Sequence, residues 1–237
     1  MSTAILEALS TGGIEVLGLL PYSSNYTFLV RVTGSEGQFL AVYKPQRGER
    51  PLWDFATGSL GAREVASYLV SEAAGWGIVP PTVFRDEGPL GAGSLQLFIE
   101  HDPDRHFFVL MEERLDDFRV FAAFDVVVNN ADRKAGHVIE DEAKVLWAVD
   151  HGLTFHVESK LRTVIWQFAD EPLGASLRSQ LGALGSVLSD PDGLGGQLAE
   201  LLTPEEATAT LERVENLLLE DSFPPPGLDR PLPWPLV

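Results

Sequence analysis

Cysteine is absent from this sequence of 237 residues. Disulfide bonds, thiolate metal sites and cysteine nucleophiles are therefore excluded, which agrees with a reducing compartment. The sequence also lacks any uninterrupted apolar run near the ~20 residues that a membrane-spanning helix requires. Its first residues contain neither a basic segment nor a long apolar stretch, so no signal peptide is predicted. We expect a cytoplasmic protein with no stable membrane anchor.

Positive charge is scarce, with 17 lysines and arginines against 35 aspartates and glutamates and a formal net charge of −18. A surface of this sign repels phosphate backbones and anionic lipid head groups, so we expect no nucleic-acid partner. The same charge favours solubility whatever the function is. A protein of this kind that binds a nucleotide must gather its few cations around that site.

Three extended segments with short turns are predicted near the N-terminus, over residues 14–20, 26–33 and 38–44. They are rich in β-branched and aromatic residues, which indicates an antiparallel meander. The first turn, from Pro21 to Asn25, consists mainly of small polar residues. It either presents backbone N–H groups to phosphate or is an ordinary β-turn. Lys44 ends the third segment, where it either reaches the phosphates of a nucleotide or is an exposed edge charge.

An amphipathic helix is predicted over residues 61–74, with apolar residues that recur on one face and a glycine after its end. Glu64 lies in its first turn, where it either pairs with Lys44 or interacts with the helix dipole. A strand over residues 94–100 leads into a polar break and is a candidate hinge between two lobes. Further helices are predicted over residues 161–169 and 176–188, and after the Thr203 capping box; a proline-rich tail follows.

Two loops in the middle of the chain carry the side chains with the most chemistry. The apolar segment around Asp125 ends in a polar loop that contains Asp132, Lys134 and His137. A second apolar run, residues 145–149, ends in Asp150-His151-Gly152. A polar turn between them predicts a β-hairpin. This hairpin places His137 and Asp150 at the same end of the ladder, close to Asp132.

These residues match the needs of phosphoryl transfer, which are a carboxylate for the acceptor, cations for the γ-phosphate and a metal ligand. We assign these roles to Asp132, Lys134 and Asp150 respectively. His137 stands five residues after Asp132, where kinase catalytic loops have asparagine. Mg²⁺ prefers oxygen ligands, whereas Mn²⁺ tolerates imidazole better. Either His137 binds metal or phosphate, or a single protein-bound metal suffices, or catalysis is lost.

Several short blocks carry a family resemblance, and they occur over roughly residues 20–155. They are Ser23-Ser24-Asn25-Tyr26, Ala41-Val42-Tyr43-Lys44-Pro45, Glu64, Val79-Pro80, residues 94–100, Asp125, Asn130-Ala131-Asp132-Arg133 and Val149-Asp150-His151-Gly152. With these blocks the chain resembles the phosphatidylinositol 3-/4-kinase-like superfamily. It is nearest to the type II phosphatidylinositol 4-kinases and to an actinobacterial family related to them.

The resemblance implies an α+β fold with two lobes. The N-lobe, residues 1–100, is an antiparallel β-sheet with one helix, and the C-lobe, residues 101–237, is small and mostly helical. The implied activity is an ATP-dependent phosphotransferase that uses ATP and Mg²⁺ or Mn²⁺. The implied roles are phosphate binding by Ser23, Ser24 and Asn25, an ATP ion pair of Lys44 with Glu64, an adenine hinge of Phe98, Ile99 and Glu100, catalysis by Asp132, and metal binding by Asp150.

The sequence departs from the family at His137 and in lacking the cysteine-rich membrane anchor of the type II lipid kinases. Together with the acidic charge, this favours a small molecule or a protein over a lipid as the unidentified acceptor. Three alternatives stay open. They are a nucleotide-binding pseudokinase, an adenylyl transferase that binds ATP in the reverse orientation, and a non-enzymatic interaction module.

Overall fold

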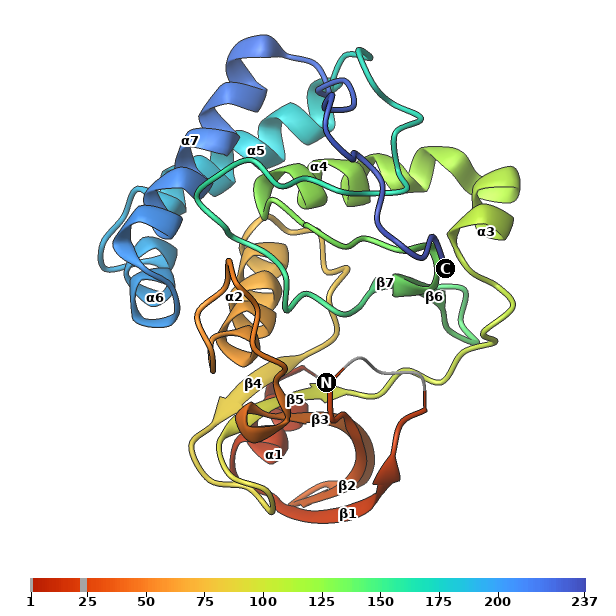
Figure 1. Ribbon diagram of the computed structural model, residues 1–237, viewed down its shortest axis with the longest axis vertical. Coiled ribbons are helices and arrows are strands. Elements are labelled where there is room, and N and C mark those ends of the chain that lie inside the picture. Colours follow the sequence, from red (N-terminus) through yellow and green to blue (C-terminus); the bar gives the residue numbers. More distant parts are fainter. Residues whose placement is uncertain (1, 22–24) are drawn as a thin grey trace.

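A computed structural model describes residues 2–21 and 25–237 of the chain (Figure 1). Its N-terminal part is a five-stranded sheet in the order β1-β2-β3-β5-β4, with neighbouring strands antiparallel. The strands are β1 (Gly13–Leu19), β2 (Phe28–Gly34), β3 (Gly37–Pro45), β4 (Thr82–Arg85) and β5 (Gly93–Leu97). The meander and its tight second turn therefore form as the β-branched and aromatic residues predict. The later strand also forms, but it ends at Leu97 and not at the predicted residue 100.

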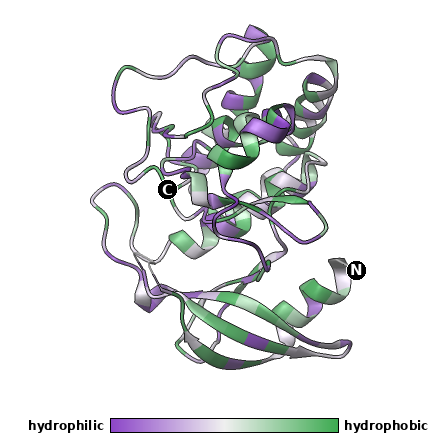
Figure 2. Ribbon diagram, turned by 90° about the vertical axis from the view of Figure 1, so that its right-hand side faces the viewer, coloured by the Kyte–Doolittle hydropathy of each residue, from purple (hydrophilic) through white to green (hydrophobic). Residues whose placement is uncertain are grey.

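Two helices accompany this sheet, α1 (Ser2–Thr11) and α2 (Leu60–Ala73). The apolar side of α1 packs on the sheet through Ala8 and Leu9, so the N-lobe contains a helix in addition to the one predicted. Helix α1 lies close to the end of strand β2, because a Cβ at Gly34 would collide with the side chain of Ala8. The smaller hydrophobic core of the molecule lies here, and Figure 2 shows the largely apolar strands below the helices.

The C-terminal part is mostly helical and contains the larger core. Its helices are α3 (Phe107–Arg114), α4 (Arg119–Val127), α5 (Ala175–Leu188), α6 (Leu194–Leu201) and α7 (Pro204–Glu220). Short 3₁₀ turns lie at Gln46–Gly48, Leu115–Phe118 and Ala135–His137. Aromatic side chains pack edge to face in this core, with ring centroids of Phe107 and Phe118 5.0 Å apart. α2 contributes to the same core through Ala66 and Val70, so it joins the sheet to the helices.

The predicted hairpin is present as β6 (Val138–Glu140) and β7 (Leu146–Ala148). The N–H of Val149 donates to the carbonyl of His137 at 3.0 Å, so His137 and Asp150 lie at the same end of the ladder as predicted. The Thr203 hydroxyl also caps α7 as the sequence predicts, with Glu206 completing the capping box.

The predicted helix over residues 161–169 is wrong. This segment is irregular, and Thr163 forms a parallel bridge with Arg133 of the loop that contains Asp132. The Thr163 hydroxyl also donates to Asp125 at 2.9 Å. Contacts with a loop distant in the sequence therefore override the local helical pattern.

The C-terminal strap, defined here as residues 224–237, crosses back over the helical part toward the hairpin (Figure 1). Its Leu236 carbonyl accepts a hydrogen bond from the N–H of Ala135 at 2.8 Å, and its Pro231 carbonyl accepts one from the N–H of Thr163 at 3.1 Å. The strap thus holds two loops of the central region together. Among the described residues, none of the helices has the length and apolar character needed to cross a membrane.

Candidate active site

A cavity of about 660 Å³ lies between the sheet and the helical part, a volume typical of small-molecule sites. Strands β3 and β5 and helix α2 line it from the N-terminal side, and the hairpin and its flanking loops line it from the other. Its apolar lining includes Leu20, Val42, Leu97, Phe98, Ile99, Ile139 and Val149. Its polar lining includes Asn25, Lys44, Glu49, Glu64, Gln96, Lys134, His137 and Asp150. One part of the cavity therefore suits a flat apolar ring and another part suits charged groups.

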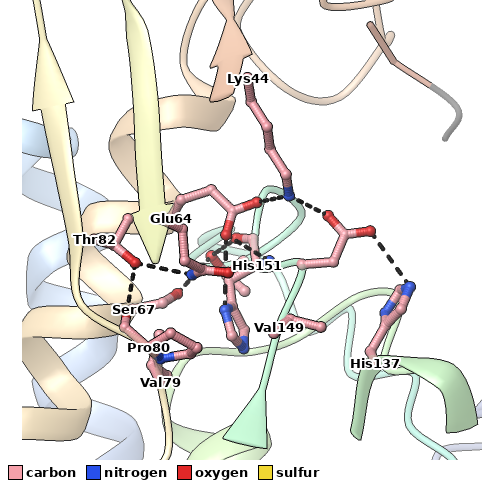
Figure 3. A network of polar contacts seen from close by, with 12 residues as sticks. Lys44, Glu64, Ser67, Val79, Pro80, Thr82, His137, Val149 and His151 are labelled. Atoms are coloured by element: carbon pink, nitrogen blue, oxygen red, sulfur yellow. Dashed lines mark hydrogen bonds and ion pairs between the residues drawn. The ribbon is translucent and has the colours of Figure 1, made fainter. Parts of the chain in front are cut away.

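The Lys44 ammonium lies in the wall of this cavity, between a carboxylate of helix α2 and a carboxylate of the segment after β7 (Figure 3). The backbone of Lys44 pairs with Ser94 near the end of β3, which aims the side chain out of the sheet and into the cavity. The ammonium contacts the Glu64 carboxylate and lies 2.8 Å from Asp150 Oδ1. Burial alone would lower the pKa of Lys44, but the charges of Asp150 and Glu64 outweigh burial and raise it. Lys44 is therefore a fixed positive charge.

Glu64 is almost fully buried on α2 and holds both Lys44 and the segment after β7. Its second oxygen accepts the backbone N–H of His151 at 2.9 Å. The orientation of α2 and the position of the Asp150 segment consequently depend on each other through the Glu64 carboxylate.

Asp150 lies at the start of this segment with a left-handed backbone, φ 61°. A non-glycine residue in this region is uncommon, and such strain concentrates at functional sites. Half of its side chain is exposed to the cavity, so lone pairs of the carboxylate stay free for a ligand. The charge of Lys44 holds the pKa of Asp150 well below its usual value.

His137 faces the other oxygen of Asp150, with 3.3 Å between Nε2 and Oδ2. Burial lowers the pKa of His137 to about 4, so the imidazole is neutral at pH 7. The backbone N–H of Lys134 points at Nδ1 at 3.4 Å, which assigns the proton of the neutral ring to Nε2. In this tautomer the Nε2–H of His137 faces the Asp150 carboxylate.

Asp132 and Lys134 form an ion pair of 3.0 Å beside the cavity. The backbone N–H of Asp132 donates to the Asn130 side chain at 3.0 Å, which fixes the loop at the point where the carboxylate emerges. Burial raises the pKa of Asp132, while the neighbouring charge of Lys134 opposes the rise. Its carboxylate is also close enough to Asp150 for the charge of Asp150 to raise the pKa further.

A fully buried ion pair of Asp125 with Arg133 supports the loop that contains Asp132, with 2.9 Å between charged atoms. Asn130 donates to the same carboxylate at 3.0 Å. Arg133 also donates to the carbonyls of His137 at 3.2 Å and Val149 at 3.0 Å. One guanidinium therefore ties the loop of Asp132 to both strands of the hairpin, and through them to Asp150.

Most of the residues singled out from the sequence meet at this cavity. Its lining includes Asn25, Lys44, Glu64, Phe98, Ile99, Lys134, His137 and Asp150. Asp132 lies beside it through its contact with Lys134. Glu100 is exposed and is not part of the lining. Ser23 and Ser24 lie outside the described residues. The roles of all these residues stay predictions.

Several lining residues stand outside the motifs that the sequence offers. Leu20, Val42, Ile139 and Val149 form the apolar walls, and strand alternation is the only signal that could have found them. Glu49 belongs to no sequence motif or periodic pattern, because it lies in a loop after the short 3₁₀ turn Gln46–Gly48. Its carboxylate accepts the N–H of Gly58 at 2.7 Å before the start of α2, and burial raises its pKa.

Comparison with protein families finds no family model that matches the chain. Protein Rv2133c of Mycobacterium tuberculosis is 37% identical over 266 residues, covering 96% of this chain and 93% of that protein. Phosphatidylinositol 4-kinase gamma 4 of Oryza sativa subsp. japonica is 27% identical over 149 residues, covering 54% of this chain and 26% of that protein.

Solved structures resemble the chain over most of its length. The Golgi casein kinase superposes with a TM-score of 0.58 at 16% identity, covering 92% of this chain and 75% of that one. The same kinase with Mn and ADP bound gives a TM-score of 0.58 at 15% identity, with 92% and 75% covered. Hydra Fam20 with sugar gives a TM-score of 0.56 at 16% identity, with 91% and 86% covered. The predicted kinase-like α+β fold with two lobes is therefore confirmed.

Proposed function

The chain belongs to the same family as Protein Rv2133c of Mycobacterium tuberculosis, and we propose that it is an ATP-dependent phosphotransferase. The reaction moves the γ-phosphate of ATP to a hydroxyl acceptor. The partial similarity to a rice phosphatidylinositol 4-kinase supports the phosphatidylinositol 3-/4-kinase-like type. The kinase-like fold, with its sheet and helical lobe around one cavity, supports the general class.

One observation carries the proposal: the Lys44 ammonium joins Glu64 and Asp150 at the wall of the cavity. In kinases a strand lysine held by a helix glutamate binds the α- and β-phosphates, and an aspartate after a hairpin holds metal. An ordinary surface lysine would have neither a buried carboxylate nor a cavity beside it. The fixed positive charge of Lys44 at the wall of the cavity supports the proposed binding of a triphosphate there.

Asp132 is the proposed catalytic residue. It accepts the proton of the acceptor hydroxyl as the acceptor oxygen forms a bond to the γ-phosphorus and the bond to the β,γ-bridging oxygen breaks. ADP leaves with that bridging oxygen. Burial strengthens Asp132 as a base because it raises the pKa of the carboxyl. Lys134, paired with Asp132 and lining the cavity, supplies positive charge to the transferring group.

Asp150 is the proposed metal ligand, because its half-exposed carboxylate keeps free lone pairs in the cavity. Within residues 2–21 and 25–237, no group of three or more His, Cys, Asp and Glu side chains could hold a metal ion by itself. The residues present therefore fit a cation that is bound partly by Asp150 and partly by the phosphates of a nucleotide. Bound Mg²⁺ or Mn²⁺ would neutralise charge on the β- and γ-phosphates. His137 could ligate it through Nε2 only with the ring proton moved to Nδ1.

The remaining parts of the site follow the same assignment. Phe98, Ile99 and Glu100 form the proposed adenine hinge, while Asn25, with Ser23 and Ser24 before it, covers the phosphates. The side chain of Asn25 accepts the backbone N–H of Arg50 at 2.9 Å, which ties its turn to the following loop. We place the boundary between the lobes at residue 100. The favoured acceptor is a small molecule or a protein rather than a lipid, because the chain is acidic.

A nucleotide-binding pseudokinase is the second candidate, and His137 favours it. The imidazole stands at the sequence position of a metal-binding asparagine and lies 3.3 Å from Asp150. A chain of this kind would bind ATP through Lys44 and Asp150 and transfer nothing.

Incubation with γ-labelled or α-labelled ATP, in Mg²⁺ or Mn²⁺, tests the proposal. The protein is assayed alone and with a cytosolic extract, and label is followed into protein and small-molecule products. Transfer from γ-labelled ATP alone is the expected result. Transfer from α-labelled ATP would show an adenylyl transferase instead. ATP-dependent thermal stabilisation without any transfer would show the pseudokinase, and no stabilisation at all would show an interaction module.

A further inference from the structure

Arg162 lies directly beside the proposed catalytic aspartate. Its backbone N–H donates to the carbonyl of Asn130 at 2.8 Å, and its own carbonyl accepts the N–H of Arg133 at 2.9 Å. These two partners flank Asp132 in the sequence, so residue 162 is fixed alongside it. The charge of Arg162 also acts on the Asp132 carboxylate.

The Arg162 side chain has no hydrogen bond or ion pair with any other part of the chain that the structure describes. Two lysines near Arg162, by contrast, do have partners. Lys160 pairs with Asp54 at 3.0 Å and lies 4.9 Å from the centroid of the Trp53 ring. Lys134 pairs with Asp132. In a chain of net charge −18, Arg162 is a half-buried arginine whose charge acts on Asp132 but which forms no ion pair in the described part of the chain.

The C-terminal strap brings a second arginine to the same place. The Pro231 carbonyl accepts the N–H of Thr163 and the indole N–H of Trp166, both at 3.1 Å. Arg230, next to Pro231, is therefore adjacent to the segment of Arg162. Arg230 is exposed, and within the described residues its side chain has no partner either.

These two arginines lie outside the nucleotide cavity. Lys134 belongs to its lining, whereas Arg162 and Arg230 do not. Asp132 pairs with Lys134, and the residues Asn130 and Arg133 near it hydrogen-bond to the backbone of Arg162. A group bound at Arg162 would consequently lie beside the proposed catalytic aspartate and outside the cavity proposed for the triphosphate, where an acceptor hydroxyl on the same group could reach Asp132.

We propose that Arg162, together with Arg230, forms a subsite for an anionic group, phosphate or carboxylate, on the acceptor. The inference rests on the proposed phosphotransferase function and adds the chemical class of the acceptor. Arginine binds phosphate and carboxylate through two parallel hydrogen bonds, which fixes orientation as well as position. A bound anion would also offset the positive charge that Arg162 places beside the base. The acceptor hydroxyl would then be held at Asp132 by a charge on the same molecule.

Titration calorimetry with inorganic phosphate tests the subsite. Phosphate is added to the full chain with and without a saturating non-hydrolysable ATP analogue and Mg²⁺. The expected result is binding of one phosphate in both states, because the subsite lies outside the nucleotide cavity. Loss of phosphate binding on nucleotide addition would overturn the inference, since phosphate would then occupy the γ-phosphate position. Failure of the analogue to bind would contradict the proposed function, while phosphate binding would still report on the subsite.

Variants connect the binding to Arg162. Arg162→Gln is expected to weaken phosphate binding at least ~10-fold, because a charged hydrogen bond is lost, and Arg162→Lys to restore part of it. Arg47→Gln is the matched control. It removes another arginine without a partner in the described part of the chain, but one that lines a separate cavity on the sheet. Equal affinity in Arg162→Gln and Arg47→Gln would overturn the inference. Thermal midpoints confirm that each variant is folded.

Further arms identify the source of the anionic group. Glycerol 3-phosphate is compared with glycerol, and phosphatidylcholine vesicles with phosphatidylinositol are compared with vesicles without it. Arg162-dependent binding of glycerol 3-phosphate would support a soluble phosphorylated acceptor. Arg162-dependent sedimentation with phosphatidylinositol vesicles would support a lipid head group in the same subsite. Binding in neither arm, or binding that Arg162→Gln leaves unchanged, would overturn the inference.

Discussion

Single side chains in this site owe their charge state to the neighbours that the fold provides. His137 is neutral because it is buried, and Asp150 stays ionised because the Lys44 ammonium lies 2.8 Å away. The sequence could supply the residue types and their spacing, since Asp132, Lys134, His137 and Asp150 stand in loops after apolar runs. It could not supply the tautomer of His137 or the pairing of Asp132 with Lys134. Those depend on contacts that form only in the folded chain.

Acid should destabilise the protein through His137. Its pKa is about 4 in the folded protein and about 6.5 when unfolded, so below pH 6.5 the unfolded chain binds a proton that the folded chain does not. This contribution to stability is complete above pH 6.5 and is lost as the pH falls toward 4. By pH 4.5 the loss amounts to about 2 kcal/mol. Urea unfolding of the wild type and of His137→Asn, measured from pH 7 to pH 4.5, checks this.

In His137→Asn the free energy of unfolding should fall less steeply over the same range, because other groups such as buried His151 remain in both proteins. Identical pH profiles would contradict a buried neutral imidazole at residue 137. The variant also restores the asparagine of kinase catalytic loops. It therefore serves in the transfer assays as well.

Helix α2 is the element that connects the site with the helical part. Arg63, the residue before Glu64, is buried and pairs with Glu206 in the first turn of α7. The same guanidinium donates to the carbonyl of Thr154, three residues after His151. The orientation of α2, and with it the position of Glu64 against Lys44, thus depends on a helix more than 130 residues away in sequence.

Glu206→Gln should destabilise the protein by about 3 kcal/mol, because it leaves the Arg63 charge buried without its partner. Glutamine still completes the capping box with Thr203, so the ion pair is the main loss. Glu205→Gln, an exposed neighbour in the same turn, is the matched control and should change stability by less than about 0.5 kcal/mol. Urea unfolding at pH 7 measures both. Similar values for the two variants would show that the buried pair contributes little.

Elements also show where sequence patterns mislead. The strands, α2, the hairpin and α7 could be predicted because their periodicity or capping residues act locally. Residues 161–169 could not, since Thr163 pairs with Arg133 and with Asp125, which lie about 30 to 40 residues earlier in the sequence. The apolar residues of this segment follow a helical spacing, but they are buried against the loop that contains Arg133 and do not form a helix.

At the scale of the molecule, a sheet-containing lobe and a helical lobe enclose the cavity that contains Lys44. The order of short motifs along the chain was enough to predict the two lobes. The C-terminal strap was not predictable in its course. Its proline-rich sequence shows no periodicity, and its position depends on hydrogen bonds to Ala135 and Thr163. The strap nonetheless packs against the segment of Arg162 and brings Arg230 next to it, where we propose the acceptor subsite.

The central claim is that Lys44, Asp132 and Asp150 act on one bound triphosphate. Transfer of label from γ-labelled ATP by Asp132→Asn, measured together with its equilibrium binding of ATP, tests this most directly. The predicted result is ATP affinity within about 3-fold of the wild type, and transfer reduced by at least ~100-fold, because the acceptor loses its base. Wild-type transfer in Asp132→Asn would contradict the account.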